Sequence, residues 1–200
     1  MRLRNSAHTS RPWRIHEITP DFRLEDVWAL PTPGGPDDFA RVVALMASAP
    51  PSPERSRAAG ALFAIRWGLG ALLGWDRPED GLGTRVTSLR SRLPSDLRHG
   101  PAGPGVGGGL FTPLYLLDDE FAAEIANRTV HGVMHLGWVP DGSGGYRGQM
   151  AVLVKPAGLL GAAYMTAIKP FRLLIVYPAL MARIDRAWQK HAGDPVRVAS

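Results

Sequence analysis

The strongest constraint on the fold is a pair of alternating segments joined by a glycine-rich turn. Apolar and polar side chains alternate in residues 128–139 and again in residues 146–155. A period of two is typical of a half-buried β-strand. The segment between them reads Pro-Asp-Gly-Ser-Gly-Gly, which favours a tight hairpin. The sequence therefore predicts an antiparallel hairpin with one apolar face. That face consists of Val130, Met134, Leu136, Trp138, Met150, Val152 and Val154.

A long apolar helical stretch follows the hairpin, from about residue 159 to residue 189. Pro170 and Pro178 lie inside it, and we expect both to kink the helix because proline removes a backbone donor. Sheet and helices are segregated along the chain, which predicts an α+β fold. The expected architecture is a curved antiparallel sheet packed on this long helix, with helices between the first strand and the rest of the sheet. The concave space between sheet and helix is a usual place for a small-molecule site.

The N-terminal half predicts one strand and two helices. Residues 13–18 alternate with period two, which indicates a short strand, whereas residues 22–30 fit either a strand or a helical turn. Asp37 and Asp38 mark a helix start, where carboxylates complement the helix dipole. We expect a second helix over residues 56–73. The apolar face of the first helix is Phe39, Val42, Val43 and Met46.

The central part of the chain is less periodic. Residues 84–97 fit a strand or a short helix followed by a turn, and the glycine-rich residues 99–109 indicate a loop. Residues 110–117 predict a strand, and residues 120–127 begin either a strand or a helical turn. The length suits one domain, which we place at residues 12–190. The tails expected to fray are residues 1–11 and 191–200.

Composition excludes several classes of function. The chain has no cysteine, which removes disulfides, thiol nucleophiles and cysteine-ligated zinc. The net charge is +5, but acidic residues interleave with the arginines and no nucleic-acid motif accompanies them. Two apolar stretches, residues 58–75 and 158–182, carry internal charges that disfavour membrane insertion. No apolar region follows the basic N-terminus, so we expect a cytoplasmic protein with neither nucleic-acid nor membrane partners.

Two motif-like features fit better as ordinary structure. Residues 103–108 match G-x-G-x-x-G, but they lie in a loop before a strand rather than between a strand and a helix, which disfavours nucleotide binding. Asp118, Asp119 and Glu120 form a carboxylate cluster that suits either acid–base chemistry or a turn and a helix cap.

His131 and His135 are the candidate chemical groups on the predicted hairpin. They share one face of a strand, about 13 Å apart, which is too far to chelate one metal ion, so no metal site is expected. One interpretation is that they line a cavity as donors or proton carriers near neutral pH. The other is that they are hydrogen-bonded on the face opposite the apolar set.

Several runs resemble a known family. They are EIANRTVHGVMHLGW at 124–138, MAVLVKP at 150–156, IKPFR at 168–172, VYPAL at 176–180, SLRSRLP at 88–94 and DVW at 26–28. The chain resembles an uncharacterised domain family that occurs alone or C-terminal to NAD(P)-binding Rossmann domains. The matches span about residues 12–188. The resemblance implies kinship with the helix-grip superfamily of START domains, polyketide cyclases and birch-pollen-allergen-like proteins, and therefore a helix-grip-like fold with a hydrophobic cavity. It implies no catalytic motif, because that superfamily includes binders and enzymes.

The resulting hypothesis is that the protein binds a hydrophobic or aromatic small molecule between the sheet and the C-terminal helix, without a cofactor. One alternative is an enzyme resembling a polyketide cyclase, dehydratase or isomerase, with His131 or His135 as the base. Another is an accessory module for a separate Rossmann-type reductase. The candidate ligand-binding residues are His131, His135, Trp138, Met150, Tyr164 and Tyr177.

Overall fold

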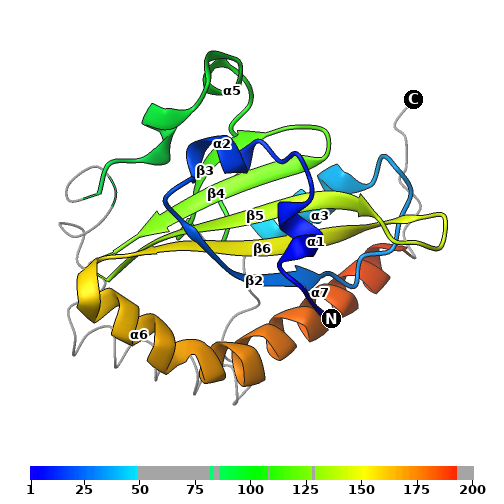
Figure 1. Cartoon of the computed structure of the whole chain (residues 1–200). Helices are drawn as coiled ribbons and strands as arrows, with labels where there is room; N and C mark the ends of the chain where they lie inside the picture. Colours follow the sequence, from blue (N-terminus) through cyan, green and yellow to red (C-terminus); the bar gives the residue numbers. More distant parts are fainter. Residues whose placement is uncertain (49–81, 83–85, 108, 128, 193–200) are drawn as a thin grey trace.

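A six-stranded antiparallel sheet curves over one long C-terminal helix (Figure 1). The computed structural model describes residues 1–48, 82, 86–107, 109–127 and 129–192, so the helix expected at 56–73 lies outside the described residues. The spatial order of the strands is β1-β2-β6-β5-β4-β3. The predicted α+β class is therefore confirmed. The strands are β1 (Arg2–Leu3), β2 (Arg23–Ala29), β3 (Thr112–Leu116), β4 (Glu120–Ala126), β5 (Val130–Pro140) and β6 (Tyr146–Pro156).

The predicted hairpin forms the centre of the sheet. Strands β5 and β6 pair continuously from Val130 opposite Pro156 to Pro140 opposite Tyr146. The turn is closed by Asp141, whose Oδ1 accepts hydrogen bonds from the backbone N–H groups of Ser143 and Gly145 at 2.7 and 3.2 Å. Glycines suit this turn because two of them adopt positive φ angles, 87° and 95°. This pairing fixes which side chains of β5 face each side of the sheet.

The two faces of the sheet have different covers. One face packs against α3 (Phe39–Ala47) and the C-terminal helix, and the apolar side chains of α3 are buried there as predicted. The other face lies under short helical segments from two distant parts of the chain. These segments are α1 (Ser6–Thr9), α2 (Ile15–Ile18), η3 (Leu89–Arg92) and α5 (Ser95–His99). The uncertain segments at 22–30 and 120–127 are strands.

The strand expected at residues 13–18 is wrong, because this segment contains α2. Ile15 and Ile18 are both buried in the same apolar cluster, and three residues of separation bring side chains together on a helical turn but not on a strand.

The N-terminal tail also departs from the prediction. Strand β1 pairs with β2, the Met1 amine donates to the carbonyl of Ala29 at 3.1 Å, and His8 is fully buried. Residues 1–11 are thus part of the fold, while 193–200 lie outside the described residues.

The C-terminal helix runs as an arc along the sheet (Figure 1). It consists of α6 (Gly158–Phe171), η4 (Arg172–Val176) and α7 (Tyr177–Ala192), and η4 is a π-helical segment. Pro170 and Pro178 flank this segment, so the predicted disturbance appears as a change of helical pitch rather than a split.

By length and composition, Gly161–Lys190 could also cross a membrane, with a mean hydropathy of 1.3 in its most apolar window. The fold around it is of a type common among soluble proteins.

Candidate functional site

An apolar cavity of about 380 Å³ lies between the sheet and the C-terminal helix. Its floor comes from β4, β5 and β6, its roof from α6, η4 and α7, and one end from α3. Four methionines line it, which gives a deformable apolar wall. They are Met46, Met134, Met150 and Met165.

The sequence leaves this space open in a simple way. Gly132 lines the cavity near the start of β5, so no side chain projects there, and its partners on the two neighbouring strands are Ile125 and Val154. A Cβ placed on Gly132 would meet Ile125 Cγ2 at 3.4 Å and nothing closer. The side chains of the sheet therefore do not completely fill the space beneath the C-terminal helix.

A polar cluster interrupts the apolar wall where the helix crosses β2. The Arg172 guanidinium and the Tyr177 hydroxyl, which both line the cavity, donate to the carboxylate of Asp26, the latter at 3.2 Å. Asp26 is fully buried on β2. Burial raises the pKa of Tyr177, and Asp26 adds to this, so the hydroxyl remains a donor at neutral pH. Arg172 Nε is buried without a hydrogen-bond partner among the described residues.

Of the candidate residues proposed from the sequence, Met150 and Tyr177 line the cavity. Trp138 lies on the same face of the sheet but outside the cavity. Its indole packs near Phe39 and donates to the carbonyl of Gly35 at 3.0 Å. Tyr164 belongs to α6, but its side chain is outside the described part of the structure.

The expectation that His131 and His135 line the cavity is wrong. Alternation along β5 sends Met134 towards the cavity and both histidines to the opposite face. There each histidine is buried and bound to a glutamate of β4, at 2.8 Å from Glu124 and 3.0 Å from Glu120. The second interpretation of these residues, hydrogen-bonded histidines facing away from the apolar set, is the one that the structure shows.

Glu120 is the centre of a buried network on this opposite face. Its carboxylate accepts hydrogen bonds from the backbone N–H groups of Arg14 and Ile15 at 2.9 and 3.0 Å, and from Tyr115 at 2.5 Å. Burial acts to raise the pKa of Glu120, but the hydrogen bonds, led by that of His135, outweigh it and lower the pKa. The carboxylate therefore stays ionised and fastens the start of α2 to the sheet.

The tautomers of the network follow from this charge. Because Glu120 only accepts, His135 carries its proton on Nε2, and its Nδ1 accepts from His8 Nε2 at 3.1 Å. Burial lowers the pKa of His8 to about 3, and the neighbouring His135 and His16 rings contribute to the shift. Both buried histidines are thus neutral at neutral pH.

Glu124, four residues further along β4, has a similar set of buried hydrogen bonds. It accepts from the Ser88 hydroxyl at 2.5 Å and from the Leu89 backbone at 3.1 Å, and so holds the start of η3. Burial opposes ionisation, but hydrogen bonds from His131 and Ser88 lower the pKa of Glu124. Sequence reasoning missed Glu124 and left Glu120 open between acid–base chemistry and a turn with a helix cap. The available signal was the matching four-residue spacing of Glu120 and Glu124 on one strand and of His131 and His135 on the next.

The buried histidines predict acid-sensitive stability. The pKa of His8 is 6.5 in the unfolded chain and about 3 in the folded protein. Between these two pH values the unfolded chain therefore binds more protons than the folded one. Stability is therefore complete above pH 6.5 and falls with pH below it. We expect His8 alone to cost on the order of 2 kcal/mol between pH 6.5 and pH 5. Urea unfolding at both pH values measures this loss.

A matched pair of variants isolates the contribution of His8. His8→Gln should shrink the loss measured between the two pH values, whereas His99→Gln, at an exposed histidine of α5, should leave it unchanged. An unchanged loss in His8→Gln would contradict the assignment.

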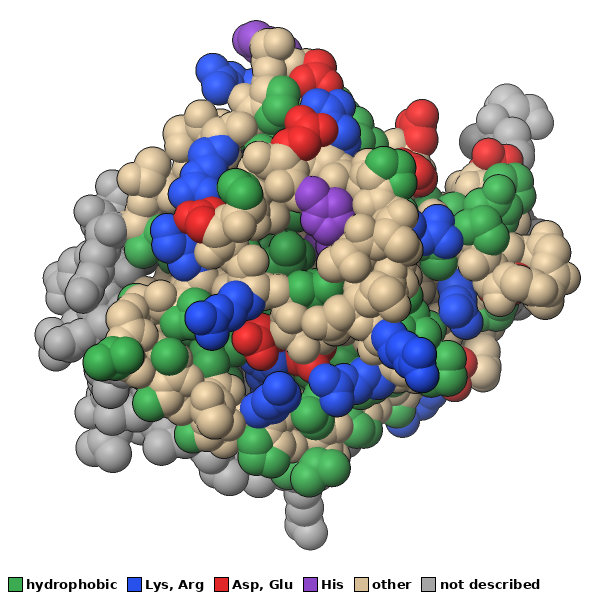
Figure 2. Space-filling view, in the orientation of Figure 1, with side chains coloured by type: hydrophobic (Ala, Val, Ile, Leu, Met, Phe, Trp, Pro, Cys, Tyr) green, Lys and Arg blue, Asp and Glu red, His purple; other side chains and the backbone are tan. Residues whose placement is uncertain are grey.

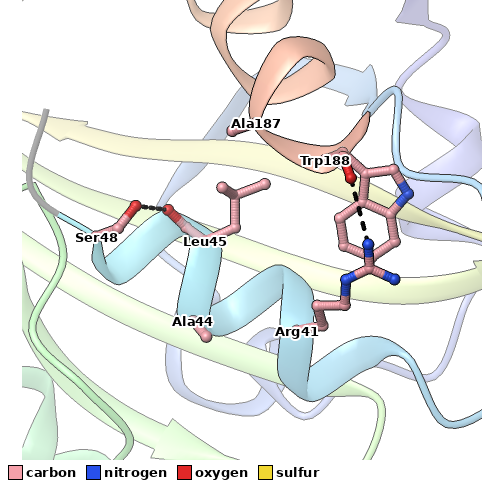
Figure 3. A pocket seen from close by; sticks show the side chains of 6 residues that line it. All are labelled: Arg41, Ala44, Leu45, Ser48, Ala187 and Trp188. Carbon is pink, nitrogen blue, oxygen red and sulfur yellow. Dashed lines mark hydrogen bonds between the residues drawn. The ribbon is translucent and has the colours of Figure 1, made fainter. Parts of the chain in front are cut away.

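Two other hollows lack the long apolar wall of the main cavity. A hollow of about 140 Å³ lies between α3 and α7, where the Arg41 guanidinium sits 4.0 Å from the centroid of the Trp188 ring (Figure 3). Another, of about 340 Å³, lies near Arg11, Trp13 and Asp119, and charged and apolar side chains both line it. Within the described residues, no group of three or more histidine, aspartate or glutamate side chains is placed to hold a metal ion. Basic and acidic side chains interleave on the face shown in Figure 2.

The comparisons with known proteins give a family. No curated protein and no solved structure matches the chain. The family model described as "Protein of unknown function (DUF2867)" matches residues 18–179, a span that begins in α2 and ends in α7. It thus covers the strands of the cavity floor and most of the helix above them. Because the match extends over most of the sequence, the chain belongs to the DUF2867 family.

Proposed function

We propose that the protein binds a hydrophobic or aromatic small molecule in the cavity between the sheet and the C-terminal helix. The observation that carries this proposal is the cavity itself, whose volume of about 380 Å³ is in the range of ligand pockets. An occupant that buries about 250 Å² of apolar surface gains roughly 6 kcal/mol from burial. Part of that gain offsets the entropy lost on association, so apolar burial alone gives a dissociation constant weaker than about 40 μM.

The proposal agrees with the suggested kinship to helix-grip proteins, in which a curved sheet and a long helix enclose a ligand. The polar cluster of Arg172, Tyr177 and Asp26 supplies the few donors that orient a bound molecule. A cytoplasmic location and cooperation with a separate Rossmann-type reductase stay predictions from the sequence.

The enzyme alternative gains no support from its proposed bases. A general base must come within hydrogen-bond reach of the substrate, and His131 and His135 lie across the sheet from the cavity. Among the described residues of the cavity wall, the group other than arginine that could exchange a proton is Tyr177, whose raised pKa suits a donor rather than a base. Binding is therefore the function that the geometry supports best.

A fluorescent apolar probe tests the proposal. We expect N-phenyl-1-naphthylamine, which is uncharged, to bind the protein saturably with a rise in fluorescence. Met134→Trp places an indole in the cavity and should weaken this binding at least tenfold. The control is Leu174→Trp, which adds the same indole on the helix at a side chain 75% exposed to solvent.

Circular dichroism shows whether each variant is folded, and Val152→Phe offers a milder filling of the same space. The proposal fails if the folded wild type shows no saturable binding. It also fails if both filled variants bind the probe as tightly as Leu174→Trp.

A further inference from the structure

Two arginines line the cavity, and their charges are balanced differently. Arg172 is ion-paired with Asp26 and lies 3.9 Å from Glu25, so its charge is neutralised within the fold. Arg183 donates from Nη2 to the backbone carbonyl of Ser48 at 3.1 Å. No carboxylate in the described part of the chain forms an ion pair with Arg183. The described wall of the cavity thus has a surplus positive charge at its α3 end.

The surroundings of Arg183 make this charge significant. Leu180, Ile184 and Leu45 line the same cavity, and the Arg183 side chain is half-buried. Burial lowers the pKa of Arg183, which reports the cost of holding a cation among apolar groups. An anion in the cavity would recover that cost through a charge-assisted, bidentate hydrogen bond.

The shape of the cavity restricts the rest of the molecule. The helical residues that line it extend from Met165 to Ile184. At a rise of about 1.5 Å per residue, these positions are nearly 30 Å apart along the arc. Between them the wall is apolar except for the neutralised cluster at Arg172. An apolar space that follows the helix, with a cation near one end, fits a chain-like amphipathic anion.

We infer that the occupant is an elongated apolar carboxylic acid, whose carboxylate is bound by Arg183 and whose chain extends along the helix towards Met165. This inference rests on the proposed function and specifies its ligand class. Arg183 is then the residue that distinguishes an acid from a neutral molecule of the same length.

Competition between two matched ligands tests the inference. Decanoate and 1-decanol have the same chain and differ in charge, and each is used to displace N-phenyl-1-naphthylamine. We expect decanoate to bind the wild type at least tenfold more tightly than 1-decanol. In Arg183→Gln this preference should fall to threefold or less, while binding of the uncharged probe is retained.

The control variant is Arg186→Gln, which removes the same charge from an exposed position of α7 and should keep the preference of the wild type. Equal affinity of the wild type for both ligands would overturn the inference but leave the proposed function intact. A preference that survives in Arg183→Gln would overturn the role of Arg183. Failure of the probe to bind would instead refute the proposed function.

Discussion

Replacing Glu120 with Gln is expected to lower the free energy of unfolding by about 3–4 kcal/mol. The carboxylate accepts from four donors, and they come from β3, β5 and the start of α2. An amide in the same place turns an NH₂ group towards at least one of these donors, so a buried N–H or O–H loses its acceptor. Chemical denaturation monitored by tryptophan fluorescence measures the change.

The control for this variant is Asp118→Asn, at the exposed position two residues earlier, which should change stability by less than about 0.5 kcal/mol. Glu120→Gln should also loosen α2, because the backbone of Arg14 and Ile15 loses its acceptor. Faster amide exchange in the N-terminal twenty residues would report this. A variant as stable as the wild type would show that the network does not fasten the N-terminal segment to the sheet.

Replacing Arg172 with Met is expected to cost about 3–5 kcal/mol, because it leaves the fully buried carboxylate of Asp26 without its charge partner. The remaining neighbours compensate little. Tyr177 donates one hydrogen bond at 3.2 Å, and Arg2 lies 3.4 Å from the other carboxylate oxygen with a half-exposed side chain. The cost is measured by chemical denaturation at neutral pH.

A double-mutant cycle separates the charge from the packing. Asp26→Asn keeps an acceptor for Tyr177 but removes the charge, so the double variant Asp26→Asn/Arg172→Met should recover at least half of the loss. Strict additivity of the two single changes would contradict a direct pairing between helix and β2.

The parts of the fold that the sequence predicts are those set by local patterns. The hairpin of β5 and β6 follows from alternation on both sides of a glycine turn, and α3 follows from its one-sided apolar stripe. Residues 13–18 show why local patterns fail elsewhere. Their alternation is a strand pattern, but Glu120, more than a hundred residues away, accepts from the Arg14 and Ile15 backbone and favours a helical turn. No local rule contains that partner.

The site was predictable only in part for the same reason. Alternation correctly placed Met134 and Met150 on the cavity face, and by the same rule it placed His131 and His135 on the other. The two histidines were grouped with the apolar cavity residues because imidazole can donate, accept and carry protons. That grouping went against the alternation rule. Arg172 and Arg183 could be found only once the arc of the helix over the sheet was known.

The most direct test of the cavity as a binding site is NMR of the protein labelled with [methyl-¹³C]methionine. Four of the six methionines line the cavity, whereas Met1, just before β1, is 71% exposed. Substitution of each methionine by leucine assigns its signal. On saturation with N-phenyl-1-naphthylamine, the account predicts that the signals of Met46, Met134, Met150 and Met165 shift while that of Met1 stays in place. Saturable binding that leaves those four signals unmoved would contradict it.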